Sequence, residues 1–191
     1  MQLDDISEFH KIDSQNMLGE IDALPAQLAK AYSDSFLYNL DRLKKPDIVL
    51  IAGMGGSAIG GDLLSAYCVP LCSVPIVNWR EYSLPAWAAS HNTLVIASSH
   101  SGNTEETVSI FNEAIKVNLP MLVITTGGEI AKSAQANQVP LWLFEHQGQP
   151  RAAVGYSFGI LLALCERLGL IPPQRQLVEE AVAEVEKKQE H

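Results

Sequence analysis

The chain has 191 residues, of which 47% are hydrophobic, and its formal net charge at pH 7 is −9. This length suits one domain of about 150 residues with additional helices better than two domains. The negative charge argues against a nucleic-acid partner, because affinity for nucleic acid comes largely from Lys and Arg that neutralise phosphates.

The cysteines and the apolar stretches of the sequence indicate in which cellular compartment the protein is expected. The three cysteines are an odd number, and Cys68 and Cys72 lack the second pair that a zinc site requires. We therefore expect reduced thiols in a cytoplasmic protein, with no metal. The acidic start of the chain does not resemble a signal peptide. The longest apolar stretch, residues 160–165, is too short to span a bilayer, so no membrane association is expected.

The first 45 residues predict a helical segment. Apolar side chains recur at helical spacing over residues 5–31, where Pro25 divides the pattern into two helices. A further amphipathic helix is predicted over residues 34–45, and Pro46 ends it. We expect residues 1–45 to lie outside the sheet of the following domain.

Residues 46–171 predict an α/β domain in which short apolar strands alternate with helices. The expected strands are 47–53, 74–79, 93–98, 120–125 and 139–144. The expected helices are 57–67, 104–118, 129–136 and 151–168, with a short helix or loop at 85–90. This alternation is typical of a doubly wound, five-stranded parallel sheet with helices on both faces. Right-handed crossovers favour the flavodoxin-like strand order 2-1-3-4-5.

The last segment, residues 172–191, follows two prolines and predicts a charged amphipathic helix over 174–189. Its apolar stripe indicates packing against the sheet domain, a partner or a further domain. No internal repeat accompanies it.

A glycine-rich turn follows the first predicted strand. Gly55 and Gly56 permit close approach of a ligand to the backbone, and Ser57 either caps the next helix or holds a ligand oxygen. An ordinary tight turn explains the same residues equally well. Gly53, Gly55 and Ala58 also satisfy a dinucleotide-binding pattern, so an NADP-binding domain remains a minor alternative.

The turn after the third predicted strand is more specific. Ser99, Ser101 and Thr104 supply three hydroxyls at the start of a helix, where free backbone N–H groups and the helix dipole favour an anion. A phosphate is the leading candidate. Helix capping by Asn103 and Glu106 is the alternative, and the two explanations are compatible. In the order 2-1-3-4-5, ligands bind between strands one and three, where both specialised turns lie.

Arg151 is the third candidate feature. A cation at the start of the last helix of the sheet is electrostatically misplaced unless it faces an anion. A surface arginine paired with Glu145 is the alternative. Structural roles are expected for Glu145 and His146, and His100 is expected to point away from any ligand.

These motifs together resemble a known family. The pattern Ser99-x-Ser101-Gly102-x-Thr104 resembles the phosphosugar signature of sugar isomerase (SIS) domains. With the turn of residues 53–57 and the run of residues 150–157, it is similar to the bifunctional phosphoglucose/phosphomannose isomerase family. The resemblance covers about residues 35–170, the first of that family's two SIS domains, so residues 172–191 would lead toward a second SIS domain.

The resemblance implies an aldose–ketose isomerase that interconverts glucose 6-phosphate or mannose 6-phosphate with fructose 6-phosphate and needs no cofactor. It implies that Ser99, Ser101 and Thr104 grip the phosphate. By the same resemblance Gly55, Gly56 and Ser57 contact the substrate, and Arg151 is the catalytic residue that stabilises the enediolate.

The family's proton-shuttling glutamate and ring-opening histidine belong to its second half, beyond residue 191. The resemblance therefore implies a chain that binds sugar phosphates weakly and turns over little alone. It also implies a homodimer. A phosphosugar-sensing SIS module without catalysis is the main alternative to an isomerase half.

Overall fold

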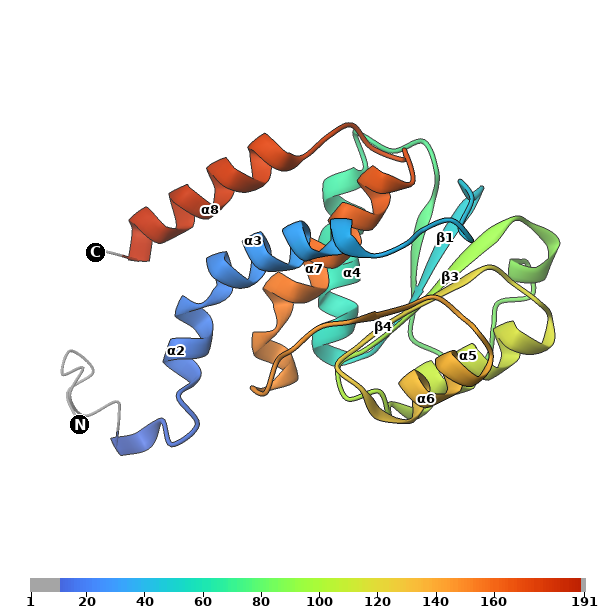
Figure 1. Ribbon diagram of the computed structural model, residues 1–191, viewed down its shortest axis with the longest axis horizontal. Coiled ribbons are helices and arrows are strands. Elements are labelled where there is room, and N and C mark those ends of the chain that lie inside the picture. Colours follow the sequence, from blue (N-terminus) through green and yellow to red (C-terminus); the bar gives the residue numbers. More distant parts are fainter. Residues whose placement is uncertain (1–10, 190–191) are drawn as a thin grey trace.

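The computed structural model describes residues 11–189, which are built around one parallel β-sheet (Figure 1). The strands are β1 (Ile48–Ala52), β2 (Ile76–Trp79), β3 (Thr93–Ser99), β4 (Met121–Thr125) and β5 (Leu141–Leu143). They pair in parallel in the order β2-β1-β3-β4-β5. The predicted fold class and strand order are therefore confirmed.

Helices cover both faces of this sheet (Figure 1). One face carries α4 (Gly55–Cys68) and α7 (Val154–Arg167), and the other carries α5 (Glu105–Lys116) and α6 (Gly128–Ala136). Successive strand residues point to opposite faces, so Val49 and Ile51 enter one core while Leu50 and Ala52 enter the other. Every residue of β3 is buried, as expected for a central strand covered on both faces.

The remaining helices lie on the α7 side. They are α2 (Met17–Asp22), α3 (Leu24–Asp34) and α8 (Arg175–Gln189), with α3 on α7 and α8 on α3 (Figure 1). Glu166 of α7 links this helix to α3 and α8. Its carboxylate accepts hydrogen bonds from the Tyr32 hydroxyl of α3 and, at 2.8 Å, from the backbone N–H of Gln174, which directly precedes α8. The prediction of two helices divided at Pro25 is confirmed only in part, and its residues 5–10 lie outside the described residues. Pro25 lies in the first turn of α3, after a break at Ala23, but residues 13–16 form a further break before α2 that the sequence did not predict.

The helix predicted over residues 34–45 is wrong. The chain forms a 3-10 turn, η1 (Ser35–Leu37), and is extended at Tyr38. The Arg167 guanidinium donates to the carbonyls of Ser35 and Tyr38, which takes the acceptors that a continuing helix would use. Beyond the turn, the Asp41 N–H bonds the Asn39 side chain, a local bond that competes with helix formation.

Two further segments refine the predicted boundaries. Residues 88–90 form the 3-10 turn η2 (Ala88–Ser90), as expected for a short helix or loop. The helix predicted from residue 151 begins as a separate 3-10 turn, η3 (Pro150–Ala152), and α7 starts after it at Val154. Arg151 therefore lies in η3 and does not open the long helix.

Candidate functional site at the ends of β1 and β3

The three motifs singled out by the sequence meet at the carboxyl edge of the sheet. The His100 N–H, in the turn after β3, donates to the Ser57 Oγ of the glycine turn at 3.1 Å. The glycine turn also contacts η3, because a Cβ placed on Gly56 would lie 2.3 Å from the Pro150 carbonyl oxygen. Segments around residues 56, 100 and 151 therefore form one cluster at the point where the strand order reverses.

The glycine turn needs its glycines for two separate reasons. Gly55 has a φ of +52°, a left-handed conformation that favours glycine. Gly56 needs space, since any side chain would collide with η3. Ser57 is buried and its hydroxyl accepts from the neighbouring turn, so it joins two loops and makes no cap on α4.

The three hydroxyls after β3 have different surroundings. Ser99 is 2% exposed; its Oγ accepts from the Gly102 N–H at 3.1 Å and lies 2.9 Å from Thr104 Oγ1. Ser101 is exposed, and its Oγ accepts from the Asn103 N–H at 3.2 Å. Ser99 thus holds the turn together from inside, while Ser101 lies on the solvent side.

The capping arrangement considered for α5 does not form. Thr104 precedes the helix, and no side chain caps it. The Asn103 Oδ1 accepts instead from the Glu129 N–H of α6 at 3.0 Å. The start of α5 is therefore without a side-chain cap, and its N–H groups point toward the edge where an anion is expected.

Arg151 lies beside the glycine turn on η3. Its Cα is 3.2 Å from the position of a Cβ on Gly56, and its side chain is exposed. Within residues 11–189 Arg151 makes no ion pair, so the pairing with Glu145 considered from the sequence is not formed there. A cation without a carboxylate partner at this edge is available to an anionic ligand.

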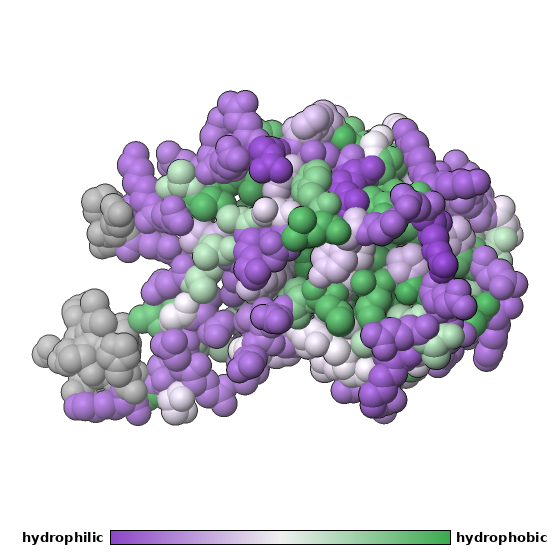
Figure 2. Space-filling model, in the orientation of Figure 1, coloured by the Kyte–Doolittle hydropathy of each residue, from purple (hydrophilic) through white to green (hydrophobic). Residues whose placement is uncertain are grey.

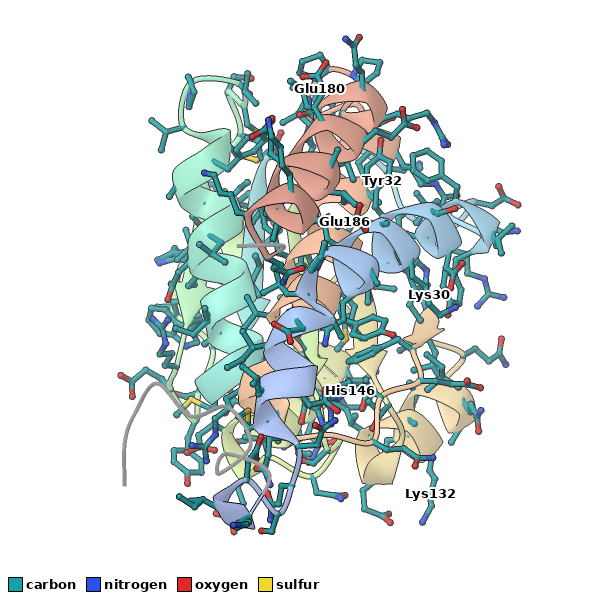
Figure 3. The ribbon with its side chains drawn as sticks, turned by 90° about the vertical axis from the view of Figure 1, so that its left-hand side faces the viewer. Lys30, Tyr32, Lys132, His146, Glu180 and Glu186 are labelled. Atoms are coloured by element: carbon teal, nitrogen blue, oxygen red, sulfur yellow. The ribbon has the colours of Figure 1, made fainter. Side chains whose placement is uncertain are left out.

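A series of hydrogen-bonded side chains behind the turn of residues 99–104 was not predicted. His100 Nε2 lies 2.8 Å from His146 Nδ1, and His146 Nε2 lies 2.9 Å from Glu20 Oε2. Figure 3 shows His146 beside α2, which carries Glu20. Burial, followed by the nearby His146, lowers the pKa of His100 below its usual 6.5, so His100 is neutral at pH 7. Its ring packs edge-on against Phe144, in agreement with the expected packing role.

No local sequence pattern predicts these hydrogen bonds, because Glu20 and His146 are 126 positions apart in the sequence. His100 and His146 stand at the ends of non-adjacent strands, and Glu20 belongs to a helix outside the sheet. Sequence reasoning assigned His146 a structural role without a partner.

Other parts of the described chain offer fewer groups for chemistry. A pocket of 250 Å³ lies between α3, α7 and β5, and its charged side chains include Lys30 and Asp34, which pair with each other. Figure 2 shows apolar residues gathered at the centre of the face that it views and polar residues around them.

Between residues 11 and 189, no three His, Cys, Asp or Glu side chains are grouped to hold a metal ion. No helix in that range combines the length and apolar character that a membrane span requires.

Comparison with known proteins places these motifs in context. No family model matches the chain. A bifunctional phosphoglucose/phosphomannose isomerase from Caldicellulosiruptor bescii is 44% identical over 161 residues, which is 83% of this chain and 47% of that protein. The chain is a homologue of the bifunctional phosphoglucose/phosphomannose isomerases. It spans about half the length of the curated isomerases that it matches.

Solved structures agree with the fold of an isomerase homologue. A putative phosphosugar isomerase from Silicibacter pomeroyi superposes with a TM-score of 0.66 at 17% identity, covering 90% of this chain and 55% of that one. The Vibrio vulnificus NanR protein, complexed with ManNAc-6P, superposes with a TM-score of 0.58 at 19% identity, covering 94% and 72%. The SIS fold expected from the sequence is therefore confirmed.

Proposed function

We propose that this chain is the phosphosugar-binding half of a bifunctional phosphoglucose/phosphomannose isomerase. In this proposal it binds glucose 6-phosphate, mannose 6-phosphate and fructose 6-phosphate at the edge formed by the turns after β1 and β3. The observation that carries the proposal is the meeting of the glycine turn, the hydroxyl-rich turn and Arg151 at this one edge, in a homologue of these isomerases.

The phosphate is assigned to the turn of residues 99–104. An uncapped helix start offers N–H donors, and the exposed Ser101 hydroxyl adds another within the same turn. Thr104 and the buried Ser99 contribute mainly by fixing the turn through their hydroxyl pair. Local donors of this kind explain how a chain with a net charge of −9 could hold a phosphate dianion.

The sugar is assigned to the space beside Gly55, Gly56 and Ser57, and Arg151 to the reacting carbons. When a base removes the C2 proton of the open-chain aldose, negative charge develops on O1 and O2 of the enediolate, and reprotonation at C1 gives the ketose. A guanidinium held next to the sugar favours that intermediate over the neutral substrate. The close approach of the Pro150 backbone to Gly56 supports this role, because it holds η3, which carries Arg151, beside the glycine turn.

The base and the ring-opening group are assigned to a second SIS domain outside this chain. In this proposal residues 1–45 precede the first SIS domain and carry α2 and α3, residues 46–171 form that domain, and residues 172–191 lead toward the second. We also propose a cytoplasmic homodimer, since the reduced cysteines suit the cytoplasm and the family resemblance implies a dimer.

Ligand binding without turnover tests this proposal. In a thermal-shift titration, fructose 6-phosphate and glucose 6-phosphate should raise the melting temperature of the chain, because a ligand that binds the native state stabilises it. NADPH should not raise it, and this result would exclude the NADP-binding alternative. The Arg80 side chain, which could bind the 2′-phosphate of NADP, forms an ion pair with Asp62 instead. Isomerase activity should be far below that of a full-length relative. Stabilisation by NADPH alone, or full activity of the isolated chain, would contradict the proposal.

A phosphosugar sensor is the second candidate. It is favoured by the likeness to the NanR protein, whose structure was solved in complex with ManNAc-6P. Both candidates bind a sugar phosphate, so binding does not separate them. Addition of the second half of a full-length relative does: an isomerase half gains turnover when completed, whereas a sensor gains none.

A further inference from the structure

His100 is a junction between several loops at the candidate site. Its N–H donates to Ser57 Oγ in the turn after β1 at 3.1 Å. Its carbonyl accepts from the N–H and the hydroxyl of Thr126, after β4, at 3.2 and 2.8 Å. Its side chain bonds His146, after β5. The second residue of the proposed phosphate turn is thus bonded to the segments that follow three other strands.

Two hydrogen bonds continue from His100 to α2. The Glu20 carboxylate accepts from His146 Nε2 at 2.9 Å. His100 Nε2 and His146 Nδ1 share one ring proton at 2.8 Å, so one of the two rings donates to the other. The His146 side chain is 7% exposed and that of Glu20 is 27% exposed, so water competes little for the bond between them.

Polar contacts attach α2 to the site. Helix α2 has no buried residue, so burial of apolar surface does little to hold it. Besides the Glu20–His146 bond, the Gln149 side chain donates to that of Gln15 at 2.7 Å, just before α2. A Cβ on Gly148 would lie 2.7 Å from Glu20 Oε1, so the loop before η3 packs closely on this carboxylate. That loop leads directly to Arg151.

We propose that Glu20 and His146 are positioning residues for phosphosugar binding, and that the Glu20–His146–His100 chain couples the docking of α2 to the geometry of the phosphate turn. This inference rests on the proposed function, because it requires a phosphosugar at the turn. The coupling is reciprocal: docked α2 holds the turn in its binding geometry, and a bound phosphate stabilises docked α2 by the same free energy.

Calorimetric titration with fructose 6-phosphate tests the first half of this coupling. Glu20→Ala and His146→Phe should each raise the dissociation constant about three- to ten-fold, which is the effect of losing one hydrogen bond. Neither side chain is expected to contact the ligand itself. Glu20→Gln should lie between them and the unchanged protein, since its amide oxygen still accepts from His146. Glu180→Ala is the matched control: Glu180 is exposed on α8 and lies far from His146 (Figure 3). It should leave the dissociation constant unchanged.

Hydrogen exchange tests the reverse direction and excludes a merely structural effect. Fructose 6-phosphate should slow exchange at the amides of residues 17–22 in the unchanged protein, and this protection should be lost in His146→Phe at saturating ligand. Equal dissociation constants for all variants, or exchange in α2 that ignores the ligand, would overturn the inference and leave the proposed function standing. Absence of fructose 6-phosphate binding by the unchanged protein would overturn both.

Discussion

At the scale of single residues, the two serines of the phosphate turn should respond differently to the same substitution. Ser99→Ala removes the acceptor of the buried Gly102 N–H and should lower the free energy of unfolding by about 1–2 kcal/mol. Ser101→Ala should change it by less than about 0.5 kcal/mol, because Ser101 is exposed. It should instead weaken fructose 6-phosphate binding. Urea denaturation and calorimetry measure the two effects; equal ligand affinity of Ser101→Ala and the unchanged protein would remove Ser101 from the phosphate site.

This difference marks how far the sequence predicts the site. The clustering of Ser99, Ser101 and Thr104 after an apolar strand is visible in one short stretch of sequence, and it was enough to predict an anion site there. Which hydroxyl turns inward depends on the backbone of the turn, where Gly102 has a φ of +68°. The partner of Asn103 lies 26 residues away at Glu129, so the local capping pattern was misleading.

At the scale of elements, the crossing of α4 and α7 depends on Gly60. A Cβ there would lie 2.4 Å from Ser157 Cβ and 2.9 Å from its backbone carbon. Helix propensity alone favours Ala over Gly by about 1 kcal/mol. Gly60→Ala should nevertheless lower the free energy of unfolding by about 1–3 kcal/mol, because the helices must separate. The double variant with Ser157→Gly should recover part of this loss in urea denaturation. A stabilised Gly60→Ala would show that the helices cross less tightly.

The elements themselves were largely predictable, and the exception has a physical cause. Short apolar strands separated by helices leave few topologies, so the sheet and its order followed from pattern and handedness. Residues 34–45 also carry a helical pattern, yet the chain leaves the helix at Tyr38. The deciding contact is Arg167, more than 120 residues away, whose guanidinium takes the Ser35 and Tyr38 carbonyls. Apolar periodicity does not report such a contact.

At the scale of the whole molecule, hydrogen bonds connect α8, α2 and the candidate site. The far end of α8 reaches α2, where the Gln189 side chain donates to the Asp22 carbonyl at 3.2 Å. Helix α2 in turn bonds His146 through Glu20. A domain that follows α8 would therefore begin close to the helix that contacts the candidate site (Figure 1). This arrangement agrees with the proposal made above that a second domain completes the site.

The stability of the whole molecule should fall as the pH drops through 6.5, with His100 as one cause. Burial and His146 hold the folded pKa of His100 below 6.5, so the unfolded chain takes up this proton first. The contribution to stability is complete above pH 6.5 and is lost as the pH falls toward the folded pKa. Urea denaturation at pH 8 and pH 5.5 should therefore give a larger loss for the unchanged protein than for His100→Phe, which has no proton to take up. Equal losses in both proteins would mean that His100 titrates alike in the folded and unfolded chains, and that burial and His146 do not lower its pKa in the folded protein.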